Sequence, residues 1–451
     1  MRKLDPYKWS RRLVSNGLPW QKQLRVLLMC AGILCLFLAQ TSLAVQRFPR
    51  PDFESGYQVP STTTPAARAP FWEYVDVAVL FLALAVATYL VLKVRSRRAV
   101  FWLMIFAIIY FGFWRRGCVC AVGSPQNMAL AFFDSSYAVP LSVVAFFALP
   151  LLTALFFGRT FCAAVCPLGA VQDAVVWKPQ KIPLWVNHVL SVVPIVYLGF
   201  AILFVATGTG FLICRWDPFI GFFRMNAPFH MLLFGGVILI VGMFIARPYC
   251  RFLCPYGVLL AWMSRLSRRH ATITPDECIQ CRLCEDACPF DAIRKPLPER
   301  SPESRHRGTR RIAVLLIALP LIMAGAAGGG YLIGPWFGNA HKTVRLAARI
   351  KAENQGVYET TTVESRTFRG SGETLASLYG KADDIRSQFA VGTAVICAFV
   401  ALALWSRIFG LSLWRRRDDY EPDRGSCLSC GRCFSYCPRE HIRRDSNQSV
   451  K

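Results

Sequence analysis

The sequence predicts an all-α polytopic membrane protein that carries a small α+β module assembled from two separated halves. Three observations predict this fold class. Hydrophobic residues make up 54% of the 451 residues, and the mean hydropathy is +0.37. Apolar stretches of membrane-spanning length recur along the chain. Two cysteine-rich segments of identical spacing, Cys278–Pro289 and Cys427–Pro438, flank one pair of these stretches.

Eight stretches are long and apolar enough to predict transmembrane helices. A basic lead-in precedes the first stretch and no small-residue cleavage site follows it, so we expect an anchor rather than a removed signal peptide. The eight predicted spans lie at about 24–45, 73–94, 99–114, 138–157, 184–206, 229–246, 312–334 and 389–409.

The basic residues divide the loops between these spans into two sets. With the N-terminus in the cytoplasm, the cytoplasmic segments carry 37 of the 52 Lys and Arg residues and the outer segments carry 15. The positive-inside rule therefore predicts a multi-pass protein of the bacterial inner membrane with both termini in the cytoplasm. This topology accounts for the net charge of +25. We expect no nucleic-acid partner, because no basic–aromatic platform or helix-turn-helix pattern accompanies the charge.

Both cysteine-rich segments have the spacing C-x2-C-x2-C-x3-C-P. Three thiolates at this spacing hold one [4Fe–4S] cluster, and the fourth ligates the other cluster of a two-cluster ferredoxin. Zinc suits the first steps but does not explain the third cysteine or the final Cys-Pro. We therefore expect a two-cluster, ferredoxin-like cytoplasmic module. Its ligand sets are Cys278, Cys281 and Cys284 with Cys437, and Cys427, Cys430 and Cys433 with Cys288.

An internal repeat occupies the third to sixth predicted spans. GRTFCAAVCPLGAVQD at 158–173 and ARPYCRFLCPYGVLLA at 246–261 share an Arg, an aromatic residue, Cys-x3-Cys-Pro and a Gly. The i, i+4 spacing places both thiols of a pair on one helical face, and Pro suits the first turn of the next helix. Packing as small buried hydrophobes is the alternative. We expect a further iron–sulfur cluster at the inner membrane surface, held by Cys162, Cys166, Cys250 and Cys254.

Each copy of the repeat also has an outer cysteine site, formed by Cys118 and Cys120 in one copy and by Cys214 in the other. Three interpretations stay open: an outer-side iron–sulfur cluster, a redox-active disulfide, and inert thiols. The cluster interpretation has a physical motive, because a hydrocarbon core about 30 Å thick is too wide for one electron hop.

These features divide the chain into five predicted regions. Two spans and an outer loop come first, the duplicated four-helix core follows, and a transmembrane hairpin with a polar, helical outer segment separates the two ferredoxin halves. In chain order, their bounds are 1–98 for the two spans with the outer loop, 99–265 for the four-helix core, 266–311 for the first ferredoxin half, 312–410 for the hairpin with its outer segment 335–388, and 411–451 for the second ferredoxin half.

The two C-x3-C-P motifs followed by CIQCRLCEDACP resemble the membrane-bound polyferredoxins of the NapH, NosR and CcoG type over roughly 100–290. The resemblance implies electron transfer between the membrane or cytoplasm and an extracytoplasmic acceptor, often in support of the maturation or reduction of another enzyme. NosR-like members carry a periplasmic flavin domain before the helices, where this sequence has a short loop. We therefore expect a separate, flavin-binding partner. The contiguous ferredoxin of the family is split here.

The predicted function is a relay of electrons between a cytoplasmic or quinol donor and a periplasmic partner that contains a flavin or a metal. Such a chain is an electron-transfer component surrounded by membrane lipid, with no catalytic residues of its own. Two alternatives stay open: a redox-sensing assembly or regulatory factor, and a metal-ion reductase whose acceptor binds at the outer cysteines.

Overall fold

The computed structural model describes residues 69–117, 121–225, 227–273, 278–297, 305–358, 360–412 and 417–449. Cys118, Cys120 and the predicted span at 24–45 lie outside these ranges. The described part of the chain is mostly helical, as predicted, and its strands pair in a two-stranded sheet.

Two apolar helices, each ending in a π-helical turn, open the described chain. α3 (Pro70–Tyr89) continues into η2 (Leu90–Val94), and α4 (Arg97–Ala107) continues into η3 (Ile108–Trp114). The Ser96 hydroxyl caps α4 by accepting a hydrogen bond from the Ala99 amide. Such a cap satisfies one of the free N–H groups at a helix start.

The duplicated core follows, and prolines begin many of its helices, as their fixed φ angle favours at a first helical position. The first copy begins with α4 and η3 and continues with α5 (Ser124–Phe133), α6 (Leu141–Phe157), η4 (Phe161–Val165) and α7 (Pro167–Ala174). The second copy contains α8 (Leu184–Leu190), α9 (Val193–Ala206), α10 (Leu212–Trp216), α11 (Pro218–Arg224), α12 (Phe229–Phe244), α13 (Pro248–Phe252) and α14 (Pro255–Arg265).

Within the described ranges, five helical stretches are long and apolar enough to cross a membrane. The number rises to six if α11 and α12, which are bent by 110° relative to each other, are counted as one broken span. α6, at the predicted span 138–157, is a shorter apolar helix. The count of eight spans therefore stays a prediction. The five stretches are Phe71–Val94, Arg97–Trp114, Trp185–Ala206, His306–Ala340 and Leu375–Gly410.

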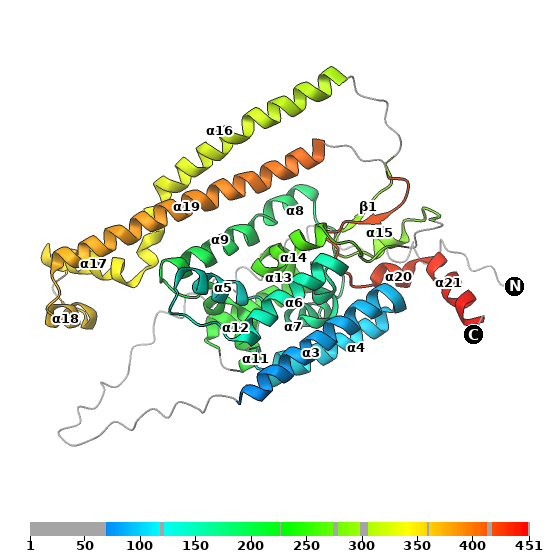
Figure 1. Cartoon of the computed structure of the whole chain (residues 1–451), viewed down its shortest axis with the longest axis horizontal. Helices are drawn as coiled ribbons and strands as arrows, with labels where there is room; N and C mark the ends of the chain where they lie inside the picture. The colour runs from blue at the N-terminus through cyan, green and yellow to red at the C-terminus, as the bar shows by residue number, and fades with distance from the viewer. Residues whose placement is uncertain are drawn as a thin grey trace. The chain divides into compact units, whose positions relative to one another are not determined.

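The predicted transmembrane hairpin is formed by α16 (Arg305–Phe337) and α19 (Leu375–Ser412), which lie side by side in Figure 1. Gly330 and Gly334 allow the close approach, since a Cβ at Gly330 would lie 2.7 Å from the Thr393 carbonyl oxygen. Between the two helices the chain forms η5 (Gly338–Ala340), α17 (Lys342–Asn354) and α18 (Val363–Gly370).

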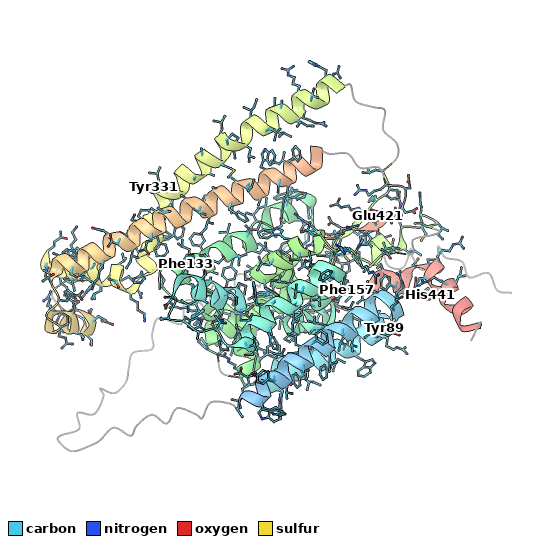
Figure 2. The ribbon with its side chains drawn as sticks, in the orientation of Figure 1. Tyr89, Phe133, Phe157, Tyr331, Glu421 and His441 are labelled. Atoms are coloured by element: carbon cyan, nitrogen blue, oxygen red, sulfur yellow. The ribbon has the colours of Figure 1, made fainter. Side chains whose placement is uncertain are left out.

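The two cysteine-rich halves meet although the hairpin separates them in sequence. β1 (Ile293–Arg294) pairs antiparallel with β2 (Glu421–Pro422), and Glu421 is labelled in Figure 2. α15 (Leu283–Ala287) packs against α20 (Arg432–Tyr436), and α21 (Pro438–Ser449) follows directly. One continuous hydrophobic core contains Phe161 and Tyr256 from the repeat together with Phe290 and Phe434 from the two halves. The halves are therefore packed onto the membrane core.

Candidate iron–sulfur sites

The two C-x2-C-x2-C segments adopt the same unusual backbone. The residue before the second cysteine has a positive φ in each, 51° at Gln280 and 52° at Ser429. The residue after that cysteine is also left-handed, 64° at Arg282 and 75° at Gly431. Left-handed residues other than glycine are strained and gather at functional sites. These turns wrap the backbone around the three thiols of each segment.

The fourth cysteine of each segment leaves this wrapped loop in an extended conformation. Cys288 has φ −85° and ψ 108°, and Cys437 has φ −83° and ψ 114°. Cys166 and Cys254 in the repeat have nearly the same angles. A following proline excludes the helical region for the residue before it. The Cys-Pro sequence therefore turns each of these four thiols away from the preceding helix.

The first site lies at a cavity that both halves line, and we call it the outlying site. Burial, together with negative charge on Cys281, Cys278 and Cys437, raises the pKa of the Cys284 thiol to about 12. Cys281 is exposed. The lining residues are Ile273, Cys278, Ile279, Cys281, Arg282, Cys284, Tyr420, Cys437 and Arg439.

The second site joins Cys427, Cys430 and Cys433 to Cys288 of the other half, and we call it the middle site. Burial raises the pKa of Cys427 to about 12, and negative charge on Cys430 and Cys288 adds to the shift. Burial also raises the pKa of Cys433, with Cys427, Cys430 and Cys288 as its charged neighbours. These thiols bind a metal only by releasing their protons. The fourth cysteine of each half thus lies with the three of the other half.

The third site is built by the repeat, and we call it the membrane site. A π-helical hydrogen bond precedes the second cysteine of each pair, from the Cys166 amide to the Phe161 carbonyl (3.0 Å) and from the Cys254 amide to the Tyr249 carbonyl (2.8 Å). Single π turns are frequent at functional sites. Cys254 lies within electrostatic range of Cys162, Cys166 and Cys250. A π turn therefore precedes the second thiol of each pair, where the sequence predicts a regular α-helix.

Two arginines at equivalent positions of the repeat enclose the membrane site. Each lies three residues before the first cysteine of its own copy and reaches the glycine of the other copy. A Cβ at Gly257 would lie 3.4 Å from Nη2 of Arg159, and a Cβ at Gly169 would lie 3.3 Å from Nη1 of Arg247. The glycines of the repeat therefore leave room for the arginine of the opposite copy.

A buried carboxylate, Asp173, connects the membrane site to the second cysteine-rich half. It pairs with Arg97, with Arg247 (3.4 Å) and with Arg432 (3.3 Å). Arg97 also donates a hydrogen bond to the Cys430 carbonyl (3.1 Å). Burial raises the pKa of Asp173, but the guanidinium groups of Arg247, Arg97 and Arg432 outweigh it and hold the pKa well below its usual range.

Two family models match the segments that build these sites. One, described as a 4Fe-4S binding domain, matches residues 139–184 and 227–274, and a second with the same description matches 271–294. The first model thus covers both C-x3-C-P motifs, and the second covers the first cysteine-rich half. These matches support a polyferredoxin-like iron–sulfur protein, and the chain resembles the NapH and NosR type over these segments.

Three curated relatives resemble this polyferredoxin-like chain. NirI of Paracoccus denitrificans is 32% identical over 165 residues. YccM of Escherichia coli K12, named as an electron transport protein, is 29% identical over 175 residues. MauN of Methylobacillus flagellatus, a methylamine utilization ferredoxin-type protein, is 28% identical over 152 residues. The alignments cover 33%, 34% and 32% of this chain, and 24%, 46% and 52% of the relatives. The chain thus spans about half or less of each relative. No solved structure matches the chain.

The structure brings together the twelve cysteines predicted for the three inner sites. In the described ranges, no three His, Cys, Asp or Glu side chains lie close enough to hold a single metal ion. The predicted outer site is described only at Cys214, which is exposed on α10.

The polyferredoxin-like chain also uses residues that the sequence interpretation overlooks. Asp173 is the last residue of the first repeat motif, and the sequence identifies Gly169 and Gly257 only as positions that the two copies share. The repeat itself was the signal for Arg159 and Arg247, because its arginine recurs at a fixed distance from the first cysteine. Burial and charge compensation could not be inferred from that spacing.

Proposed function

We propose that the protein relays single electrons through the outlying, middle and membrane sites, each of which holds a [4Fe–4S] cluster. The electrons pass between a cytoplasmic or quinol donor and a periplasmic partner that contains a flavin or a metal. The predicted outer-side centre at Cys118, Cys120 and Cys214 would supply the relay on the periplasmic side, because the hydrocarbon core is too wide for one hop from the membrane site. The proposal places the chain in the bacterial inner membrane with both termini in the cytoplasm. The relatives YccM, an electron transport protein, and MauN, a ferredoxin-type protein, support it.

The observation that carries the proposal is the continuity of the three cysteine groups. Cys433 of the middle site packs against the hydrophobic cluster that contains Cys284 of the outlying site. Arg159 contacts both the membrane site and the segment that leads into the middle site. Neighbouring redox centres within such a series exchange electrons in short steps, so the series supports a path from the exposed Cys281 to the membrane core.

The residues around the thiols supply what such a relay needs. A bound cluster accepts and releases one electron, and its potential depends on burial and on hydrogen bonds to the sulfurs. Gln172 donates from Nε2 to Sγ of Cys250 (3.3 Å), the Gly257 amide to Sγ of Cys254 (3.3 Å), and the Ser429 amide to Sγ of Cys427 (3.4 Å). Each donor stabilises negative charge on a sulfur and thereby favours the reduced cluster.

The first test is the number of clusters and their ligands. Anaerobically purified wild type should contain iron and acid-labile sulfide for at least three four-iron clusters. In EPR spectra, Cys437→Ser should alter the same cluster signal as Cys278→Ser, and Cys288→Ser the same signal as Cys427→Ser. Cys397→Ser, a thiol of α19 outside the three groups, should alter none. If Cys437→Ser and Cys427→Ser altered the same signal, the crossed ligand sets would be wrong.

The second test separates a relay from a redox sensor. Proteoliposomes that enclose ferricyanide would receive a membrane-impermeant reductant outside. A relay should reduce the enclosed ferricyanide much faster with wild type than with a Cys162→Ser/Cys250→Ser variant that keeps its other clusters. Equal rates with the two proteins would contradict a relay through the membrane site and favour the sensing alternative.

A further inference from the structure

We infer that Arg159 is a buried cation shared by two iron–sulfur sites, the membrane site and the middle site, and that it raises the midpoint potentials of both. The inference rests on the proposed function, because it takes the thiols of these two sites as cluster ligands. It assigns a tuning role to the arginine of the first repeat motif, which lies three residues before Cys162 and is not itself a ligand.

The first support is the position of the guanidinium group. Arg159 is 7% exposed. Its Nη2 donates to Sγ of Cys162 (3.7 Å) in the membrane site, and its Nη1 donates to the carbonyl of Gly425 (3.2 Å), two residues before Cys427 of the middle site. Its charge also acts on Cys250 and on Cys427. One side chain therefore reaches a sulfur of one site and the entry loop of the other.

The second support is the charge balance around the two repeat-related arginines. Arg247 has a carboxylate partner in Asp173, at 3.4 Å. Across the described part of the chain, no carboxylate forms an ion pair with Arg159, and its Nε is buried without a hydrogen-bond partner. An unpaired buried cation is strongly unfavourable. Four thiolates around a [4Fe–4S] core carry a net negative charge and would supply the missing counter-charge.

The consequence follows from elementary electrostatics. A positive charge stabilises the reduced form of a nearby cluster more than the oxidised form, because reduction adds one negative charge. The effect is largest in a water-poor environment. When one electron moves from one of these clusters to the other, the total charge beside Arg159 does not change. A shared cation therefore raises the potentials of both clusters while it leaves the driving force for exchange between them nearly unchanged.

The test uses the full-length protein, purified anaerobically in detergent, and EPR-monitored redox titration. We expect Arg159→Gln to keep its iron and sulfide content and to lower the midpoint potentials of the membrane and middle clusters. The outlying cluster, held by Cys278, Cys281, Cys284 and Cys437, should keep its potential. Arg159→Lys keeps the charge and should recover most of the loss.

Arg251→Gln is the matched control. Arg251 directly follows Cys250, but its guanidinium donates to Asn187 (3.2 Å) and to Asp291 (3.3 Å). Its charge is therefore compensated by a carboxylate, and we expect a much smaller shift of the midpoint potentials than in Arg159→Gln. An equal shift of the midpoint potentials in both variants would mean that Arg159 has no more effect than other positive charges nearby, and it would overturn the inference.

The remaining outcomes are decisive as well. Unchanged midpoint potentials in an iron-replete Arg159→Gln variant would overturn the inference. If Arg159→Gln lost iron, Arg159→Lys would decide: full iron with potentials near those of wild type supports the shared cation, whereas loss of iron in both means a structural role. A wild type with iron for fewer than three clusters would instead contradict the proposed function, which keeps the two failures distinct.

Discussion

The buried carboxylate of Asp173 forms three ion pairs, and its three arginine partners come from distant parts of the chain. Arg97 begins α4, Arg247 precedes α13, and Arg432 begins α20 in the second cysteine-rich half. Removing one partner of a buried ion pair is costly because it leaves uncompensated charge. At the residue scale, Asp173 is therefore one buried electrostatic link between the membrane core and the second half, and the buried pair of Arg95 with Glu440 is another.

We predict that Asp173→Asn destabilises the protein by about 3–5 kcal/mol, the usual cost of breaking a buried pair. The second half should detach first and become sensitive to proteolysis around α20 and α21. The measurement is thermal unfolding in detergent, combined with limited proteolysis. Arg294→Gln is the control, because the Arg294–Asp423 pair also joins the two halves but Arg294 is largely exposed. Exposed pairs contribute about 0–1 kcal/mol.

The difference in stability between wild type and Asp173→Asn depends on pH in a way that follows from the lowered pKa of Asp173. A group with a lowered folded-state pKa adds stability that is fully present above its unfolded pKa, about 3.9, and is lost as the pH falls toward the folded value. The gap in unfolding temperature between wild type and Asp173→Asn should therefore stay constant from about pH 8 to pH 5. A gap that narrowed steadily over that range would show that other groups cause it.

At the scale of elements, the cysteine spacing predicts which segments meet but not their helical geometry. Cys-x3-Cys is compatible with an α-helix, and only the hydrogen bond from Cys166 back to Phe161 reveals a π turn. Local helix propensity does not distinguish an α-helix from a π turn, because the tertiary packing of the buried thiols determines which of them forms. The predicted hairpin of 312–334 and 389–409 matches α16 and α19, since long apolar stretches give a strong signal.

The contact between α16 and α19 depends on two glycines, and we predict that Gly330→Ala and Gly334→Ala destabilise the hairpin by about 1–3 kcal/mol each. A Cβ at Gly330 would lie 2.7 Å from the Thr393 carbonyl oxygen, and a Cβ at Gly334 would overlap the Ala390 backbone. Backbone atoms cannot move aside, so the helices must separate. Thermal unfolding in detergent measures the effect.

Gly328→Ala and Gly329→Ala are matched controls on the same helix, because a Cβ at either position meets nothing within 4 Å. Alanine is favoured over glycine in a helix by up to about 1 kcal/mol. These variants should therefore be neutral or slightly stabilising. If all four variants behaved alike, helix propensity rather than contact with α19 would govern the hairpin.

For the whole molecule, the sequence predicts the membrane class and the meeting of the two split halves. The paired strands at Ile293 and Pro422 agree with that meeting. The eight-span count and the inner-membrane orientation rest on hydropathy and basic residues alone, because side-chain packing carries no information on where lipid begins. The charged residues between the sites could not be predicted, since Arg159 and Asp173 become neighbours of distant cysteines only through the tertiary fold.

The three sites differ in exposure, and this difference predicts where electrons enter from a soluble partner. Cys281 of the outlying site is exposed, whereas the membrane site lies within the hydrophobic core with Cys162, Cys166 and Cys254. We predict that a soluble dysprosium chelate speeds the electron spin relaxation of the cluster signal that Cys281→Ser removes. The signal that Cys162→Ser removes should relax as it does with a diamagnetic lanthanum chelate. Faster relaxation of that second signal would place the membrane cluster at the solvent boundary, and electrons could then bypass the outlying and middle sites.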